Sequence, residues 1–98
     1  MAQTAHDAGR LFDVLGDPDC RAILRALASP LTAREVASQC DLPLSTAYRK
    51  LETLAETPLV EQSHRVRERG KHPRQYERRA HFLLVRLPDE EVEVVTTE

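Results

Sequence analysis

One short stretch in the middle of the chain gathers hydroxyl, guanidinium and ammonium groups at helical spacing. On a helical wheel of about 100° per residue, Arg49 and Thr53 fall opposite an apolar arc of Ala47, Leu51 and Leu54. Such a polar face suits the major groove of a nucleic acid, where donors and acceptors meet base edges and phosphates. An ordinary solvated surface helix would show the same pattern, so this helix alone does not establish nucleic-acid binding. The complete polar face consists of Ser45, Thr46, Tyr48, Arg49, Lys50 and Thr53.

A run of basic residues follows this stretch. Seven of the 14 Lys and Arg residues lie between Arg65 and Arg79, and only Glu68 and Glu77 oppose them. The net charge of -2 hides this asymmetry, yet a phosphate backbone would respond to the local patch. A solvated charged hairpin is the alternative interpretation. The seven basic residues are Arg65, Arg67, Arg69, Lys71, Arg74, Arg78 and Arg79.

Two cysteines and four histidines are the other side chains whose chemistry could matter. Cys20 and Cys40 are too few for a secreted disulfide framework and form no Cys-x-x-Cys pair, which is typical of a reducing compartment. Cys20 lies in the first turn of a predicted helix, where the dipole can lower a thiol pKa. We favour a buried structural role for Cys20, with a redox switch, with or without Cys40, as the alternative. The histidines pair with no cysteine at ligand spacing, so we expect no metal site.

The composition indicates a soluble protein of one domain. A chain of 98 residues that is 41% hydrophobic and 31% charged has room for one small aliphatic core and no membrane span. The amino terminus has no basic segment followed by an apolar run, so we expect no secretion signal and a cytoplasmic location. We see no nucleophile with an adjacent base, no glycine-rich phosphate loop and no evident carboxylate pair. We therefore expect no enzyme activity and no cofactor.

The polar stretch needs elements that position it, and the sequence predicts a pair of helices. Thr32 stands three residues before Glu35, the spacing of a capping box, and this predicts the start of a short helix. Pro43 is expected to stop that helix, because it cannot donate to a preceding carbonyl. Ser45 is the predicted N-cap of the second helix, over about 45–56.

Two amphipathic helices are predicted before this pair. The first runs over about 7–16, and residues 1–6 before it are expected to be frayed. The second begins at Asp17 and Pro18, a good N-cap and a residue that the first turn tolerates, and it ends near Pro30. Its buried stripe at i, i+3, i+4 and i+7 consists of Cys20, Ile23, Leu24 and Leu27.

The period of the pattern changes after the last helix. Residues 59–67 alternate, with Val60 and Val66 predicted on one side, which indicates a strand. Gly and Pro within 69–73 indicate a turn, and 75–79 is the predicted partner strand. The sequence therefore predicts a mostly α fold with a small β-hairpin (α+β), with about four helices followed by a two-stranded wing.

The carboxyl end has two contrasting parts. The apolar run 82–85 should either continue the strand into the core or pack on a second subunit. Residues 89–98 carry five acidic side chains and no basic one, so a solvated acidic end is favoured over an added edge strand. We predict one domain over 1–88, followed by an acidic tail over 89–98.

This order of elements resembles the winged helix-turn-helix transcription regulators, with the ArsR-like group and its archaeal members as the nearest match. The resemblance covers roughly residues 8–79. It implies that the polar helix lies in a major groove and that a basic wing over about 65–79 lies along phosphates or the minor groove. The phrases that carry it are residues 11–18, 21–24, 33–37, 42–51 and 59–60. The wing residues that it implies are Arg67, Arg69, Lys71, His72 and Arg74.

The chain departs from that group in two respects. Metal-sensing members carry a paired-cysteine motif in the helix before the recognition helix, whereas that helix here has the single Cys40. The family's metal site therefore cannot be carried over. Members also usually have a further carboxy-terminal helix for dimerisation, and here an apolar strand and an acidic tail are predicted instead.

Residues and resemblance together predict a sequence-specific transcription regulator that binds double-stranded DNA, acts as a homodimer and does not contact a membrane. The first helix and the 82–87 strand are the candidate dimer interface. Two alternatives stay open. One is a winged helix that has become a protein-interaction module without specific DNA binding, and the other is a regulator that senses redox state through Cys20.

Overall fold

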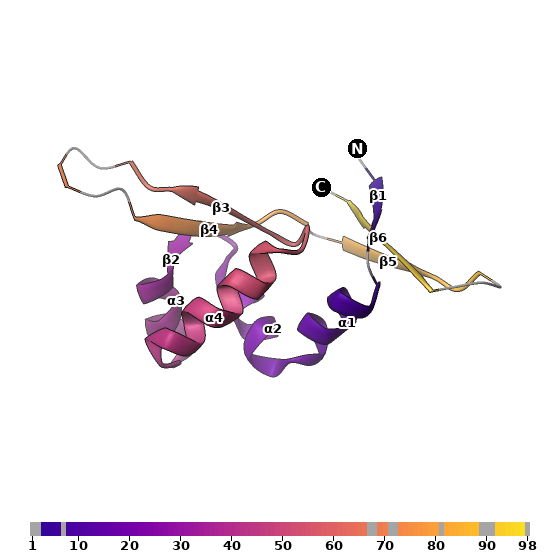
Figure 1. Cartoon of the computed structure of the whole chain (residues 1–98), viewed down its shortest axis with the longest axis horizontal. Helices are drawn as coiled ribbons and strands as arrows, with labels where there is room; N and C mark the ends of the chain where they lie inside the picture. The colour runs from indigo at the N-terminus through magenta and orange to yellow at the C-terminus, as the bar shows by residue number, and fades with distance from the viewer. Residues whose placement is uncertain are drawn as a thin grey trace.

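Four helices and two three-stranded sheets make up the part of the chain that the computed structural model describes, namely residues 3–6, 8–66, 69–70, 73–80, 82–88 and 92–97. Figure 1 shows the helices together, with one sheet over α3 and α4 and the other at the α1 end. This is the predicted α+β fold of four helices with an antiparallel wing. The elements are β1 (Gln3–His6), α1 (Ala8–Gly16), α2 (Pro18–Ala26), β2 (Leu31–Thr32), α3 (Ala33–Cys40), α4 (Leu44–Ala55), β3 (Val60–His64), β4 (Arg74–Arg78), β5 (Phe82–Arg86) and β6 (Glu93–Thr97).

The first two helices form where the sequence predicted them. Asp17 caps α2, and its carboxylate accepts a hydrogen bond from the Asp19 amide at 3.3 Å. The predicted stripe of α2 faces inward, because Cys20, Ile23 and Leu27 are all buried. These residues join one core cluster with α1, α3 and α4.

The helix-turn-helix unit is α3, a tight turn and α4. The predicted capping box is present, since the Glu35 amide donates to Thr32 Oγ1 at 3.3 Å and the Thr32 amide donates to Glu35 Oε1 at 2.8 Å. α3 ends at Cys40, and its C-cap Asp41 has a left-handed φ of 55°. The prediction of Ser45 as the N-cap of α4 was wrong. The carbonyl of Pro43 accepts the first helical bond, from Ala47 at 3.0 Å, so α4 begins one residue before Ser45 and has no side-chain cap.

The wing is the hairpin of β3 and β4, and β2 extends it into the wing sheet, in the order β2-β4-β3. Tyr76 of the central strand pairs with Gln62 on one side and Leu31 on the other, and its side chain is completely buried. Val60 also faces the core. Val66 does not, because β3 ends at His64 and the Val66 side chain is 86% exposed. The predicted alternation therefore failed beyond His64.

The terminal sheet joins both ends of the chain, in the order β1-β6-β5. Three expectations are corrected here. Residues 3–6 form β1 rather than a frayed end, 93–97 form the central strand rather than a solvated or edge segment, and 82–86 form β5 of this sheet rather than continuing the wing into the core. The physical reason is burial of the central strand, because α1 packs against β6 and leaves Val94 only 1% exposed.

The two sheets lie one after the other along an elongated molecule of 54 × 28 × 17 Å (Figure 1). The wing lies at one end of the long axis and the β5–β6 hairpin at the other. The core between them is aliphatic, with Ile23, Leu27, Val36, Leu51 and Leu54 all completely buried. This core holds α4 beside the base of the wing.

Candidate nucleic-acid interface

The outer face of α4 presents most of the predicted polar side chains. Ala47, Leu51 and Leu54 are completely buried, so the opposite side of the helix meets solvent. The Thr53 hydroxyl donates to the Arg49 carbonyl oxygen at 3.1 Å and keeps its own oxygen as an acceptor. Of the predicted residues on this face, Ser45, Tyr48, Arg49 and Thr53 are exposed and Thr46 is half-buried.

Lys50 turns toward α2. Its ammonium pairs with the carboxylate of Asp17 and lies 3.9 Å from the Asp19 carboxylate, and only 17% of its side chain is exposed. The hydrogen bond to Asp17 raises the pKa of Lys50, and Lys50 in turn lowers the pKa of Asp17. The sequence placed Lys50 at an edge of the polar face, whereas in the structure its ammonium fastens α4 to the start of α2.

A groove of about 360 Å³ runs between the start of α3, α4 and the base of the wing. Arg34 enters it from the first turn of α3, Tyr48 from α4 and Arg74 from the first residue of β4. Arg74 also lies 3.9 Å from the carboxylate of Glu52. Two guanidinium groups beside a phenol can bind phosphate oxygens. The sequence analysis selected Tyr48 and Arg74 and missed Arg34, whose only signal was its position two residues after the N-cap.

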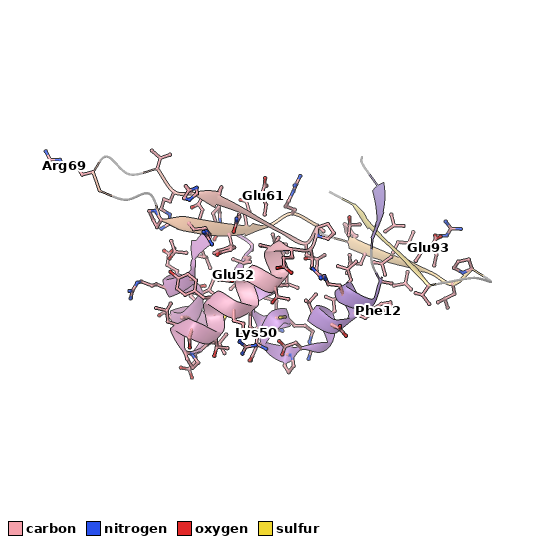
Figure 2. The ribbon with its side chains drawn as sticks, in the orientation of Figure 1. Phe12, Lys50, Glu52, Glu61, Arg69 and Glu93 are labelled. Carbon is pink, nitrogen blue, oxygen red and sulfur yellow. The ribbon has the colours of Figure 1, made fainter. Side chains whose placement is uncertain are left out.

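The wing continues beyond this groove. Gly70 has a φ of 82°, in the left-handed region that favours glycine, and this agrees with the predicted turn. Figure 2 shows Arg69 at the far end of the wing, extending away from the rest of the molecule. The predicted residues Arg67, Lys71 and His72 lie outside the described residues.

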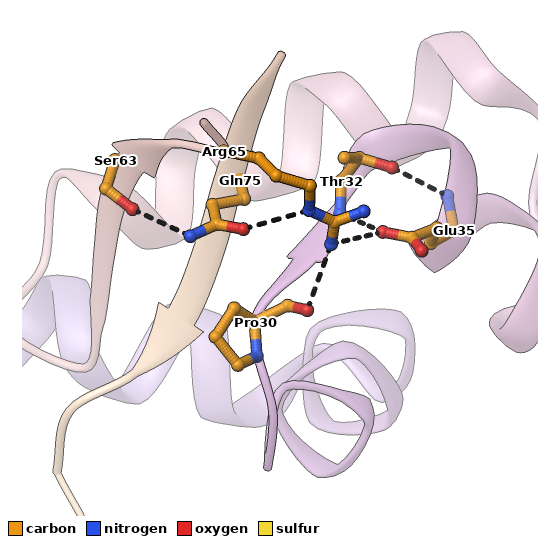
Figure 3. Close-up of polar contacts among 6 residues, drawn as sticks. All are labelled: Pro30, Thr32, Glu35, Ser63, Arg65 and Gln75. Carbon is orange, nitrogen blue, oxygen red and sulfur yellow. Dashed lines mark hydrogen bonds and ion pairs between the residues drawn. The ribbon is translucent and has the colours of Figure 1, made fainter. Parts of the chain in front are cut away.

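Arg65 joins the wing to the helix-turn-helix unit, as Figure 3 shows. Its guanidinium donates to Glu35 Oε1 at 2.8 Å, to Gln75 Oε1 at 3.2 Å and to the carbonyl oxygen of Pro30 at 3.4 Å. Gln75 in turn donates to the Ser63 hydroxyl at 3.2 Å. The side chains of two wing strands are thereby connected to the start of α3. The sequence analysis counted Arg65 as one more basic residue and missed this positioning role.

The basic run therefore divides into two groups. Arg78 donates to the carbonyl oxygen of Leu24 at 3.2 Å, and Arg79 lies 3.7 Å from the carboxylate of Glu61. Together with Arg65, these residues make contacts within the protein. Arg69 and Arg74 form the other group. Like Arg79 they are exposed, and Arg74 also lines the groove.

Glu35 acts in the capping box and the wing contact at once. The hydrogen bond from the Thr32 amide, with that from Arg65, lowers the pKa of Glu35 to about 2. Its carboxylate is therefore charged at neutral pH and holds both donors. This arrangement couples the start of α3 to the wing, and hence sets how the wing lies relative to α4.

The cysteines do not have the environment of reactive thiols. Cys20 is 3% exposed, and burial is the main reason that its pKa rises to about 12. The dipole effect expected from the sequence is therefore outweighed. Cys40 is half-buried, and burial raises its pKa as well. Burial thus favours the protonated form of both thiols, which is the less reactive form.

The chain matches a known protein family. Residues 15–63, half of the chain, match the family model described as "Helix-turn-helix domain". The chain belongs to this helix-turn-helix family, whose fold is a class of DNA-binding architecture. The matched segment contains α2, β2, α3, α4 and most of β3, so it includes the polar face of α4 and the capping box of Thr32 and Glu35. No curated protein matches the chain.

A solved structure has a similar fold. It is described as a "Possible transcriptional regulator from Methanosarcina mazei Go1", with a TM-score of 0.58 and 15% sequence identity. The match covers 81% of this chain and 75% of that one. At this level of identity the likeness concerns the fold. In the described part of the chain, no helix has both the length and the apolar character needed to cross a membrane.

Proposed function

We propose that this protein is a transcription regulator that binds double-stranded DNA in a sequence-specific manner, with α4 in the major groove and the wing along the phosphate backbone. One observation carries the proposal. The exposed face of α4 adjoins the groove that contains Arg34 and Arg74, and Tyr48 belongs to both surfaces. A base-reading surface and a phosphate-binding surface therefore share one border.

The proposed roles follow from exposure and charge. Arg49 has the geometry for a bidentate contact with a guanine, and the neighbouring hydroxyls can contact other base edges. Arg34 and Arg74 would bind phosphates beside the helix, with Arg69 farther along the wing. Lys50 would act indirectly, by holding α4 against α2. The remaining base-contacting residues are Ser45, Thr46, Tyr48 and Thr53, and the remaining wing contacts are Arg67, Lys71 and His72.

We also propose that the regulator acts as a homodimer on sites of two-fold symmetry, which is the usual arrangement for helix-turn-helix proteins. Assignment to the ArsR-like group remains a prediction from the sequence. Redox sensing through Cys20 is not part of the proposal, because its buried thiol is protonated at neutral pH.

The test is binding of the purified protein to DNA from its own upstream region and to a scrambled duplex, each across a salt series. Fluorescence anisotropy should show a preference for the upstream sequence that persists at physiological salt. Equal binding to both duplexes that weakens steeply with salt would contradict sequence-specific regulation. That outcome would favour a winged helix that works as a protein-interaction module.

Three arginine variants separate the proposed roles. Arg49→Ala should lose about 1 to 3 kcal/mol of preference for the upstream duplex. Arg74→Ala should weaken binding to both duplexes alike and reduce the salt slope by about 1. Arg25→Ala is the matched control, because Arg25 is an exposed arginine on α2 that does not line the groove. If Arg49→Ala binds like Arg25→Ala, the proposed role of α4 is wrong.

A further inference from the structure

β5 is an edge strand whose two faces are both apolar. It forms one border of the terminal sheet. On one face Phe82 is 72% exposed and Leu84 is 56% exposed. On the other face Val85 is 48% exposed, and Leu87, just past the strand, is 78% exposed. Monomeric proteins rarely leave so many large apolar side chains together in water.

The edge of the wing sheet is different. β3 borders that sheet, and its residues Glu61, Gln62, Ser63 and His64 are all polar and exposed. An edge strand presents unpaired backbone groups, and proteins normally protect such an edge with polar or charged side chains. β3 follows this rule and β5 does not. The apolar edge of β5 is therefore a site where a further strand can pair.

One face of the terminal sheet packs against its own domain. Val94 is buried beside α1, and Leu83 packs against the core from the same face of the sheet. The hairpin of β5 and β6 lies at one end of the molecule, and the wing lies at the other end (Figure 1). A partner at β5 would therefore leave the exposed face of α4 free.

We propose that β5 pairs with β5 of a second copy, antiparallel about a two-fold axis at Leu84. The two terminal sheets then form one continuous sheet of six strands. In this register Leu84 lies opposite its counterpart, and Phe82 lies opposite Arg86 of the partner subunit. Arg86 is the only charge on β5, and it does not meet the partner's Arg86. Its guanidinium stays 3.2 Å from Glu93 of its own chain.

Edge pairing accounts for apolar residues on both faces of β5. Each cross-strand pair brings Cβ atoms to about 5 Å, so Leu84 and Val85 both gain apolar neighbours. Stacking of two terminal sheets face to face would cover Leu84 and leave Val85 and Leu87 in water. A charged peptide strand would find no unpaired partner charge on β5. A second copy of the same apolar strand, whose one charge is already paired with Glu93, fits both requirements. The inference rests on the proposed function only in that it assumes a homodimer.

Disulfide trapping tests the register. In a Cys40→Ser background, mild oxidation should cross-link Leu84→Cys to its counterpart, because directly opposed positions approach the spacing that a disulfide needs. Chains with Phe82→Cys and with Arg86→Cys should cross-link when mixed, and neither should cross-link alone. Val66→Cys is the control, since Val66 is an exposed apolar residue on the wing. Cross-linking of Val66→Cys at the same rate, or none with Leu84→Cys, would overturn the proposal.

Sedimentation tests the interface without a new cysteine. The unmodified protein should be a dimer, and Leu84→Lys should dissociate at least about tenfold more readily. Val66→Lys should stay dimeric, and circular dichroism should show both variants folded. An unmodified protein that is monomeric at the concentrations of the DNA titration would refute the β5 interface, even if it binds DNA specifically. A β5 dimer without DNA preference would instead refute the proposed regulator and support the interface.

Discussion

The wing sheet and the terminal sheet each have three strands, but they contact the helices in different ways. The central strand of the wing sheet inserts Tyr76 completely into the core, and Arg65 and Arg78 tie its strands to the helices. The central strand of the terminal sheet buries Val94 against α1, and its outer strand leaves Phe82 72% exposed. The wing sheet has a polar outer edge at β3, whereas the terminal sheet has an unprotected apolar edge at β5.

This difference suits the two sheets to different roles. Under the proposed function the wing sheet holds charged side chains beside α4, and the contacts of Arg65 and Arg78 with the helices fit that role. The terminal sheet lies away from that surface, and its edge has the composition of an interface. The proposed DNA contact of the wing and the proposed subunit contact of β5 therefore lie toward opposite ends of the long axis.

The largest expected effect contrasts the two buried central residues. Tyr76→Ala should lower the free energy of unfolding by about 3 to 5 kcal/mol, because it leaves a large cavity beneath the wing sheet. Val94→Ala removes fewer buried atoms and should cost about 2 kcal/mol. Chemical denaturation measures both values. Equal costs would show that the terminal sheet is as firmly integrated as the wing sheet.

Hydrogen exchange compares the sheets strand by strand. Amides in the middle of β4 should exchange only through global unfolding, because the strand has partners on both sides. Amides of β5 should exchange about 100-fold faster in dilute protein, which corresponds to local opening at about 2.7 kcal/mol less. Protection of β5 should rise with protein concentration if the strand pairs between copies. Protection that is equal in both strands and independent of concentration would contradict this view.

Two arginine–glutamate pairs provide a third comparison. Arg65 reaches Glu35 from another element, with further bonds to Gln75 and Pro30, so Arg65→Ala should cost about 1 kcal/mol. It should also weaken DNA binding by misplacing the wing. Arg86 and Glu93 form an exposed pair between neighbouring strands, so Arg86→Ala should cost at most about 0.5 kcal/mol. Thermal unfolding and anisotropy would measure these effects, and equal losses would deny Arg65 its positioning role.

Local signals in the sequence were sufficient for the helix-turn-helix unit. The spacing of Thr32 and Glu35 predicted the start of α3, and the wheel of α4 predicted which residues are buried. Ser45 was misjudged because its hydroxyl is a common cap, whereas Pro43 supplies the first accepting carbonyl. Most of the proposed base-contacting residues were predictable for the same reason, since their exposure depends on the helix alone.

Contacts between distant residues were not predictable. Lys50 and Asp17 are 33 positions apart, and Arg65 and Glu35 are 30 apart, so nothing local distinguished them from other charged residues. The pairing of β1 with β6 joins opposite ends of the chain. The alternation around Val94 was visible, but its acidic surroundings favoured solvent. Burial by α1 reversed that prediction, and only the folded arrangement reveals it.

The last expected effect is a pH dependence of the contact between the wing and α3. The pKa of Glu35 is lowered from 4.5 to about 2 in the folded protein, so its contribution is complete above pH 4.5 and is lost as pH falls toward 2. Because its side chain is 41% exposed, solvent screening should limit this contribution to about 1 kcal/mol.

The pH dependence is best measured as a difference between variants, because other carboxylates also titrate in this range. The loss of stability on replacing Glu35→Gln should be largest at pH 6 and should shrink between pH 4.5 and 2. In an Arg65→Ala background the same dependence should be weaker but present, since the Thr32 amide is the larger cause of the lowered pKa. A dependence that vanished with Arg65 would assign the effect to the wing contact alone. A constant loss across this range would mean that Glu35 has the same pKa in the folded and unfolded protein. The ion pair of Arg65 and Glu35 would then contribute no more stability than the exposed pair of Arg86 and Glu93.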